Sequence, residues 1–487
     1  VWSTTSLNID NVIPGLKFVS RFTYNLRTNH FKKFNPIRDE VGKPVLSNNL
    51  QETTYRADAW KTENTLTYDN TFGDHTIGVL LATTADHSET RGLEVTGTDL
   101  ADESAYLQYL AYAKSLKGTD YLTGPDANVS LIGRLAYSYA DRYFLTASFR
   151  RDYAGRLPKE NNYGDFPAFT LGWKISNESF FKKSDLISLL KVRASWGRIG
   201  NISSVPIAYK SPVLDKTSWN EQAQYGVASN TVWGNIVFIP TDALNVDLTW
   251  ETSEQTNIGV DTRFLGGKLS FTFDWYSKKT KDLLINVPVS SINGFTTKAA
   301  NAGSIENKGI EISLGWNDSV GDDFTYGANF NLSHNKNEVI EVNNGSGYVE
   351  GGNDNLSQNT GFMARMKEGH PIGYFYGYKT DGVMQNMDDV QAYLNQNCGG
   401  NVANSLQGTS IKPGDLKFVD VNGDGVINSD DKTDLGNPHP DITMGLNLNA
   451  AYKGFDLSIS AYGAFGQQVA RSYRKFTDGQ YENYTTE

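Results

Sequence analysis

Hydrophobic and polar residues alternate along many segments of the chain. In residues 442–452 every even position is apolar, whereas Asn447 and Asn449 lie between those positions. The same period of two occurs in residues 269–275 and 324–332. This period is typical of a β-strand with one apolar and one polar face, and we count about thirteen such strands. The pattern therefore predicts an all-β protein.

The connections between these strands alternate between short and long. Short turns are predicted at Gly73-Asp74, Ala140-Asp141, Gly266-Gly267, Lys453-Gly454 and 317–323, with a longer link at Ser176 to Ser188. Long polar connections are predicted at residues 85–127, 151–165, 199–247, 285–307, 336–440 and 466–487. Such alternation favours an antiparallel transmembrane β-barrel with short periplasmic turns and long extracellular loops. A soluble array of β-sandwiches stays open as the alternative.

The polar faces of the strands fit a barrel better than a sandwich. A water-filled lumen, or a domain inside it, would satisfy their side chains, whereas a dry core would not. The residues expected to point inward are Lys17, Arg21, Asn25, Arg134, Lys191, Arg193, Asp261, Arg263, Glu311, Asn447 and Asn449. Aromatic residues near strand ends suit girdles at the two membrane interfaces. They are Tyr139, Tyr143, Trp173, Trp196, Trp250, Trp275, Tyr276, Trp316, Tyr452 and Phe455.

Composition narrows the classes of function. The net charge of -11 argues against nucleic acid as a partner, because binding phosphates requires Lys and Arg. No apolar run approaches the roughly 20 residues of a membrane-spanning helix. Cys398 is the one cysteine, which excludes an internal disulfide framework and a cysteine-based zinc site, and it is interpreted as an incidental loop residue.

Motifs of enzymes are missing from the sequence. It contains no GxSxG, HExxH or Walker motif, and its six histidines are scattered. Carboxylates are abundant, but nothing in the sequence singles out a glycosidase pair. We therefore predict that the protein is not an enzyme.

Residues 420–431 match a calcium-binding loop. Oxygen-bearing side chains fall at loop positions 1, 3, 5, 9 and 12, Gly425 stands at the sharp turn, and a backbone carbonyl stands at position 7. The expected ligands are Asp420, Asn422, Asp424, Val426, Asn428 and Asp431. Position 12 is Asp, whereas the bidentate ligand of such loops is usually Glu, and an Asx-rich turn without metal is the alternative. The expected role of calcium is to stiffen the extracellular region 336–440.

Three aromatic residues of one long connection are candidates for substrate binding. Trp219, Tyr225 and Trp233 lie within residues 199–247, and their rings would stack on a sugar or contact a partner. Packing within the loop is the alternative.

Seven stretches resemble the barrel of SusC/RagA-type transporters from Bacteroidetes, in the same order and with similar spacing. One of them is SWGRIGN at Ser195 to Asn201, and the longest is Gly414 to Pro440. The others are residues 131–151, 248–261, 276–287, 301–314 and 373–385. The resemblance extends over most of the chain, and the motifs are specific only together.

The resemblance implies active import of large nutrients across the bacterial outer membrane. Such transporters take up oligosaccharides or oligopeptides, are energised through TonB, and pair with a SusD-like surface lipoprotein that acts as a lid. Their barrels have about 22 strands, so residues 1–487 are expected to be a barrel fragment, with the plug domain and the last strands outside it. The alternatives are a surface or secreted β-rich glycan-binding protein braced by calcium and, less favoured, a calcium-dependent polysaccharide hydrolase.

Overall fold

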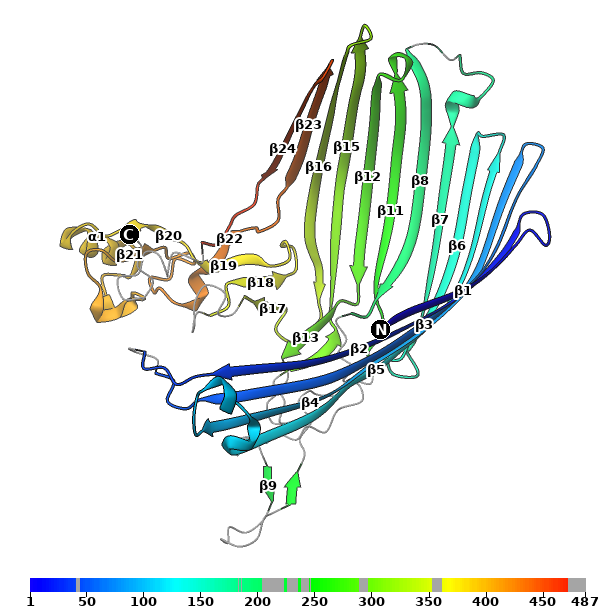
Figure 1. The fold of residues 1–487 in the computed structure, drawn as a ribbon. Helices are drawn as coiled ribbons and strands as arrows, with labels where there is room; N and C mark the ends of the chain where they lie inside the picture. Colours follow the sequence, from blue (N-terminus) through cyan, green and yellow to red (C-terminus); the bar gives the residue numbers. More distant parts are fainter. Residues whose placement is uncertain are drawn as a thin grey trace. The chain divides into compact units, whose positions relative to one another are not determined.

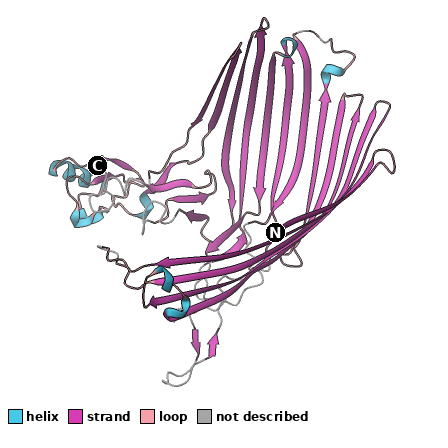
Figure 2. Cartoon of the chain, in the orientation of Figure 1, coloured by secondary structure: helices cyan, strands magenta, loops and turns pink. Residues whose placement is uncertain are grey.

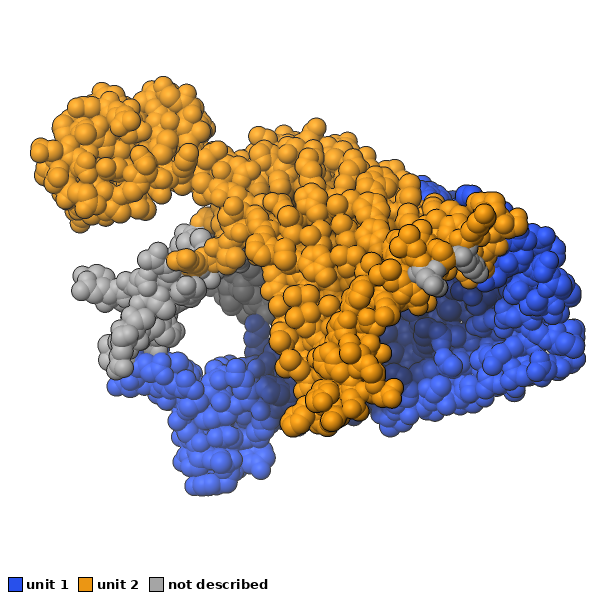
Figure 3. Space-filling view, turned by 90° about the horizontal axis from the view of Figure 1, so that it is seen from above, with its two compact units in different colours: residues 1–173, 196–252, 289–300 blue, residues 174–195, 253–288, 301–487 orange. Residues whose placement is uncertain are grey.

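Strands make up most of the part of the chain that the structure describes (Figure 2). The computed structural model describes residues 1–40, 44–182, 184, 186–203, 223–225, 235–237, 245, 247–288, 297–352 and 361–471. Among these residues, no helix is long and apolar enough to cross a membrane. The chain divides into unit 1, residues 1–173, 196–252 and 289–300, and unit 2, residues 174–195, 253–288 and 301–487 (Figure 3).

The first part of unit 1 is a run of seven antiparallel strands, and each is paired with the next along the chain (Figure 1). They are β1 (Trp2–Asp10), β2 (Leu16–Asn35), β3 (Asn49–Phe72), β4 (His75–Leu100), β5 (Ala113–Tyr139), β6 (Tyr143–Ala154) and β7 (Tyr163–Lys174). Two of the predicted short turns are confirmed here. Gly73 has a φ of +57°, and both Ala140 and Asp141 have positive φ, as the tight turns that match strand twist require.

Unit 2 contains most of a second run of seven strands, in the order β8-β11-β12-β15-β16-β23-β24 (Figure 1). They are β8 (Ile187–Asn201), β11 (Glu251–Phe264), β12 (Leu269–Lys281), β15 (Gly303–Val320), β16 (Phe324–Val342), β23 (Ile442–Tyr452) and β24 (Phe455–Phe465). The pairings from β12 through β15, β16 and β23 to β24 are all antiparallel. The shorter strands between them are β9 (Ala223–Tyr225), β10 (Asn235–Val237), β13 (Leu284–Pro288) and β14 (Thr297–Asn301).

One predicted connection is largely strand. β4 continues to Leu100 and β5 begins at Ala113, so residues 101–112 remain of the connection expected at 85–127. The prediction was wrong because neither face of this outer part of the ladder is apolar, and a period of two then leaves no hydrophobic signal. The described 3-10 helices are Ala105–Leu107, Leu110–Tyr112, Ile175–Asn177, Leu265–Gly267, Val402–Asn404, Gly408–Ser410 and Ser429–Asp431.

The region predicted as one long extracellular loop, residues 336–440, has its own secondary structure after β16 ends at Val342. A four-stranded sheet has the order β17-β18-β19-β22, and a two-stranded sheet joins β20 to β21. Their bounds are β17 (Tyr348–Gly351), β18 (Ala364–Lys367), β19 (Tyr374–Tyr378), β20 (Thr380–Val383), β21 (Leu416–Phe418) and β22 (Lys432–Gly436).

Arg365 anchors the four-stranded sheet. Its guanidinium carbon lies 4.0 Å from the ring centroid of Tyr348 and 3.5 Å from that of Tyr376. Its Nη2 also donates a 2.7 Å hydrogen bond to Glu350. A cation between two aromatic faces is held by the ring quadrupoles, so one side chain ties β17, β18 and β19 together.

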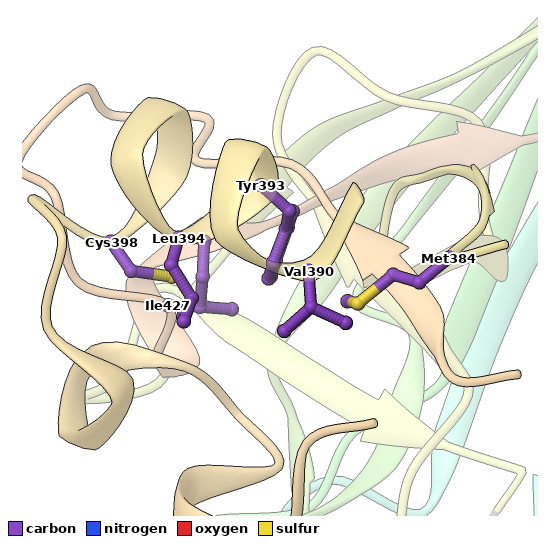
Figure 4. Packing of buried hydrophobic residues seen from close by; sticks show 6 residues of the cluster. All are labelled: Met384, Val390, Tyr393, Leu394, Cys398 and Ile427. Atoms are coloured by element: carbon purple, nitrogen blue, oxygen red, sulfur yellow. The ribbon is translucent and has the colours of Figure 1, made fainter. Parts of the chain in front are cut away.

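Residues 380–431, called the α1 module below, surround the helix α1 (Met387–Asn397). The side chain of Asn386 caps the helix by accepting a hydrogen bond from the Asp389 amide, and two aspartates of the first turn complement the helix dipole. Gly399, with a φ of +58°, follows the helix and turns the chain away. The buried residues of the module pack under this helix (Figure 4): Met384, Val390, Tyr393, Leu394, Cys398 and Ile427.

Candidate functional sites: the two strand faces and the 420–431 loop

One face of the unit 2 strands is apolar over many consecutive rows. Because paired residues point to the same side of a sheet, the register shows which side chains share a face. Phe271 of β12 pairs with Leu314 of β15, which pairs with Phe330 of β16, and Phe330 pairs with Leu446 of β23. We call this side the apolar face of unit 2. Further members are Leu269, Phe273, Trp275, Ile310, Ile312, Trp316, Phe324, Leu332, Leu448, Tyr452, Phe455, Leu457 and Ile459.

The opposite face of the same strands is polar. Asn329 pairs with Asn447, and Glu311 pairs with Ser333. On this face Tyr276 donates a 3.0 Å hydrogen bond to Asn335. The prediction that Glu311, Asn447 and Asn449 lie opposite the apolar residues is confirmed by these pairings.

A charged cluster belongs to this polar face. Arg193 of β8 lies 2.6 Å from a carboxylate oxygen of Asp274 and 3.1 Å from one of Asp261. Arg193 also donates a 3.3 Å hydrogen bond to Asn257. Such a half-buried guanidinium is compensated by its two carboxylates, so the cluster holds β8, β11 and β12 in one register without an unpaired charge.

Unit 1 has the same division into an apolar and a polar face. Phe18 pairs with Leu66, Leu66 with Leu81, Leu81 with Gly133, and Gly133 with Phe149. We call this side the apolar face of unit 1. The large apolar residues that are exposed on these strands concentrate on it, and they include Phe22, Leu66, Leu81, Val129, Leu131, Leu135, Phe149, Phe169 and Leu171. The predicted inward residues Lys17, Arg21, Asn25 and Arg134 lie on the other side.

Aromatic rings form a ladder at the short-turn end of the apolar face of unit 1. The centroids of His75 and Tyr139 are 4.8 Å apart, those of Tyr139 and Tyr143 are 6.4 Å apart, and those of Tyr143 and Trp173 are 6.5 Å apart. Four neighbouring strands thus each contribute one ring to the same row. This confirms the prediction of an aromatic girdle for Tyr139, Tyr143 and Trp173.

A second set of rings lies farther along the same face. Tyr153 contacts Tyr163 at 6.2 Å, and Trp60 stacks on His87 at 6.0 Å. Tyr143 and Tyr153 are ten positions apart on β6, which is ~34 Å of strand. With the usual strand tilt of roughly 40°, the apolar band between the two girdles is about 25 Å high.

The apolar face of unit 2 has the same height. Its first row contains Phe324 and Tyr452, whose rings are 6.3 Å apart, and its last apolar row, ten positions along β16, contains His334 and Ile310. The next row pairs Lys308 with Lys336. Two stretches of strand therefore give the same spacing of ten residues, close to the thickness of the hydrocarbon layer that barrels span.

Two residues expected in the girdles lie elsewhere. Tyr276 is on the polar face, where its hydroxyl bonds Asn335. Trp250 contacts Phe166 edge-on at 5.3 Å, and Phe166 pairs with Arg150 on the polar side of unit 1. Both predictions were wrong because an aromatic residue at a strand end is equally suited to either face, and only the register decides.

The 420–431 loop is closed by hydrogen bonds from its own backbone. The carboxylate of Asp420 accepts from the Gly423 and Gly425 amides at 2.7 and 2.8 Å. Asp431 is fully buried and accepts from the Val421 and Asn428 amides at 2.9 and 2.8 Å. Gly425, at the predicted sharp turn, has a φ of +78°. The loop therefore has the turns expected of a calcium loop, in an arrangement that an Asx-rich turn also adopts.

The loop is joined to the α1 module on its inner side. Ile427 packs into the buried cluster beside Leu394 and Cys398 (Figure 4). The Asn404 side chain donates to the carbonyl oxygens of Gly425 and Cys398 at 3.1 and 3.2 Å, and the Ile427 amide donates to the Asn404 carbonyl at 2.7 Å. Burial raises the pKa of the Cys398 thiol and raises the pKa of the neighbouring Tyr393 to about 12. Cys398 is thus a core residue and not an incidental residue of a loop.

The oxygen donors of the loop suit a hard cation, but its carboxylates do not converge on one point. Among the described residues, no group of three or more His, Cys, Asp and Glu side chains is arranged to hold a metal ion. Asp420 and Asp431 use their oxygens on backbone amides instead. Of the predicted substrate-binding residues, Trp219 and Trp233 lie outside the described residues, as does the side chain of Tyr225.

Comparison with known proteins relates the chain to one group. The sequence model of the family described as "TonB dependent receptor-like, beta-barrel" matches residues 2–394. The chain is 31% identical over 462 residues to TonB-dependent receptor P3 of Formosa agariphila, covering 94% of the chain and 43% of that protein. It is 33% identical over 373 residues to TonB-dependent receptor SusC of Bacteroides thetaiotaomicron, covering 75% of the chain and 34% of that protein. The chain thus spans less than half the length of these relatives.

The fold is similar to that of a solved transporter. A chain of the RagAB peptide transporter superposes with a TM-score of 0.75 at 20% sequence identity, covering 99% of this chain and 49% of that chain. At this identity the likeness concerns the fold alone. It agrees with the antiparallel barrel strands predicted from the period of two.

Proposed function

Since the chain belongs to the family of TonB-dependent receptor-like β-barrels, and thus to a class of outer-membrane receptors and transporters that are not enzymes, we propose that it forms part of an active importer of large nutrients. The observation that carries this proposal is the pair of faces on its strands. Phe271, Leu314 and Phe330 lie on a band with the height of the hydrocarbon layer, while Asn329 and Asn447 lie on the opposite side.

The import step requires no chemistry from the strands. On this proposal the polar face, with Arg193, Asp261 and Asp274 paired on it, lines the conduit or contacts a plug within it. Energy reaches the protein through TonB, and a SusD-like lipoprotein closes the extracellular side. The transported class is oligosaccharides or oligopeptides, in keeping with relatives that are named SusC and the RagAB peptide transporter.

The test uses the full-length protein from native outer membranes. We expect it to require mild detergent and to bring down a SusD-like lipoprotein in near-stoichiometric amount, identified by mass spectrometry. Loss of TonB should abolish uptake of any ligand found in the complex. A protein that stays soluble without detergent would instead support the surface glycan-binding alternative.

We propose calcium binding by the 420–431 loop as a second, structural property. It is supported by the oxygen spacing and by the anchoring of Ile427 in the α1 module. Asp420, Asn422, Asp424, Asn428 and Asp431 would supply side-chain oxygens, and Val426 a carbonyl. The ion would add rigidity to the module and take no part in transport chemistry.

Metal content distinguishes calcium binding from the metal-free turn. We expect the purified protein to hold one calcium ion after dialysis against micromolar calcium, and Asp424→Ala to lose it. Asp430→Ala is the matched control, because Asp430 is at the eleventh position of the loop and is not an expected ligand. Absence of calcium from the unmodified protein would favour the Asx-rich turn, and calcium retained equally by both variants would contradict the proposed ligand set.

A further inference from the structure

Strands β2 to β5 continue past the second girdle as a four-stranded sheet, which we call the outer ladder (Figure 1). It consists of residues 27–35, 49–57, 90–98 and 115–123, which are paired in register from β2 through β3 and β4 to β5. The outer ladder lies at the end of these strands that is opposite the short turns. Because short turns are periplasmic in outer-membrane barrels, the outer ladder is on the extracellular side.

One side of the outer ladder has a small apolar core. This side continues the apolar face of unit 1, and the segment 101–112 packs on it. Leu50 is fully buried there, and Leu110 of the segment lies close to Gly97, where an added Cβ would be 3.2 Å from its Cδ2. The core of the outer ladder therefore needs no contribution from the opposite side, which continues the polar face of unit 1.

Three aromatic rings nevertheless lie on that opposite side. Tyr55, Gly92 and Tyr121 form one row, and Phe31 is in the next row, within diagonal reach of Tyr55. A Cβ at Gly92 would overlap Cζ, Oη and Cε1 of Tyr121, so the hydroxyl end of this ring lies over the glycine. Phe31 is 49% exposed and Tyr121 is 39% exposed. We call these three rings the aromatic shelf, and they offer flat apolar surface to a ligand.

The charged residues beside the aromatic shelf are mostly cationic. On this side of the outer ladder they are Arg27, Lys33 and Lys117, against the single carboxylate of Glu94. Arg27 lies 5.7 Å from the ring centroid of Tyr55, and within the described part of the chain none of the three cations is paired with a carboxylate. A cationic surface on a chain with a net charge of -11 is complementary to an anionic ligand.

We propose that the aromatic shelf binds an acidic oligosaccharide, whose sugar rings bear carboxylate or sulfate groups. The C–H faces of the sugar rings would stack on Phe31 and Tyr121. Arg27 and the two lysines would pair with the acidic groups. The rows from Arg27 to Lys33 extend over ~20 Å of strand, which accommodates several sugar rings.

A peptide fits this surface less well. Peptides bind to sheets mainly by adding a strand at an edge, where backbone N–H and C=O groups are free. The strands that carry Tyr55 and Gly92 are each paired on both sides. The shelf therefore presents rings and side chains but no free backbone. The inference rests on the proposed import function and narrows its substrate class to acidic sugars.

Binding of the full-length protein in mild detergent to an array of probes tests the class of ligand. The probes are uronic-acid oligosaccharides, sulfated oligosaccharides, neutral oligosaccharides and oligoglutamate. We expect acidic oligosaccharides to be retained, and less so as the salt concentration increases, because salt screens exposed charges. Retention of neutral oligosaccharides or oligoglutamate in their place, or of no probe at all, would overturn the proposed ligand.

Substitutions of tyrosine locate the ligand on the shelf. Tyr121→Ala removes the ring over Gly92 and should weaken binding of the retained oligosaccharide about tenfold, whereas Tyr121→Phe keeps the ring and should bind nearly as the unmodified protein does. Tyr106→Ala is the matched control, because Tyr106 is 74% exposed in the segment that packs on the other side. Equal affinities of Tyr121→Ala and Tyr106→Ala would overturn the site.

A variant without two of the cations gives a second test that leaves every ring in place. Lys33→Gln combined with Lys117→Gln should reduce the salt dependence of binding, and an unchanged salt dependence would contradict the role of these lysines. Heat-modifiable gel mobility checks that each variant is folded. Uptake separates this proposal from that of import. Binding that depends on Tyr121 without TonB-dependent uptake would overturn import alone, whereas uptake with binding unaffected by Tyr121→Ala would overturn the shelf alone.

Discussion

The strands of unit 2 leave large apolar side chains exposed, whereas the α1 module buries its apolar side chains in a core. In β23 and β24, Leu446, Leu457 and Ile459 are among the exposed large apolar residues. In the α1 module, Leu394 and Cys398 are almost fully inaccessible. Both regions belong to one chain and one unit. The difference between them reflects their surroundings, which are lipid for the strands and water for the α1 module.

This difference separates two sources of stability. The α1 module has a core that excludes water, and its free energy of unfolding depends on packing in the manner of a soluble domain. The strands have hardly any core of their own, since a single sheet cannot bury both faces. Lipid covers their apolar face, and the continuous ladder of hydrogen bonds between strands pairs their backbone N–H and C=O groups.

The largest expected effect comes from a charge on the apolar face. Phe330→Arg places a guanidinium near the middle of the band, where the cost is about 2–4 kcal/mol. Asn331→Arg is the matched control, because this neighbour points to the polar face. We expect the folded barrel to be depleted from outer membranes for the first variant only, measured by heat-modifiable gel mobility. Similar losses for both would mean that the two faces are wrongly assigned.

A cavity in the α1 module should have an effect of similar size that stays local. Leu394→Ala removes a residue that is 7% exposed, for a cost of about 3 kcal/mol within the module. The expected result is rapid proteolysis within residues 380–431, while the barrel still migrates as folded. Leu416→Ala, at a position that is 45% exposed in the same module, should leave proteolysis unchanged. Loss of the folded barrel in Leu394→Ala would show that the two regions are not independent.

Removal of the helix cap tests the same module more gently. Asn386→Ala deletes the side chain that accepts from the Asp389 amide, at a cost of about 1 kcal/mol. Hydrogen exchange in the first turn of α1 should accelerate about fivefold, as that energy implies. Gln391→Ala, on the exposed side of the helix, should not change it. Unaltered hydrogen exchange in Asn386→Ala would show that the cap does not stabilise the helix.

The smallest change involves the reactivity of one thiol. Burial raises the pKa of Cys398, so little thiolate forms at pH 8, and the alkylation rate should be low and should increase with pH up to that raised pKa. Iodoacetamide labelling followed by mass spectrometry measures this rate. Ser410→Cys in a Cys398→Ser background provides an exposed thiol in the same module, expected to react much faster. Equal rates would place Cys398 at the surface.

The sequence predicts the strands well where one face meets lipid. The period of two in residues 324–332 identifies β16, and the girdle positions of Tyr139, Tyr143 and Trp173 follow from their places at strand ends. Beyond the band the alternation disappears, which explains why the ends of β4 and β5 were missed. Fourteen strands occur in the two runs where about thirteen were predicted.

The α1 helix was also missed, although its signals are present. Asn386 precedes two aspartates, and Val390, Tyr393 and Leu394 recur at helical spacing. The 420–431 loop was located correctly as a sharp turn, but its occupancy by calcium depends on ligand distances that spacing does not fix. Side-chain contacts across strands, such as those of Tyr276 and Trp250, depend on register, which a single sequence leaves open.

Two register shifts occur in the long ladders whose pairing the structure describes, and both lie outside the band between the girdles. One is at Ser88 and Thr90, just beyond His87, and the other is at Ser304 and Ile305, beyond the row of Lys308. Between the girdles, successive side chains alternate strictly between the apolar and the polar face. Deleting one residue there would therefore move every following side chain of the strand to the opposite face. Length changes during evolution are therefore expected to accumulate outside the band, and epitope tags should be tolerated at the strand ends but not between Phe324 and His334.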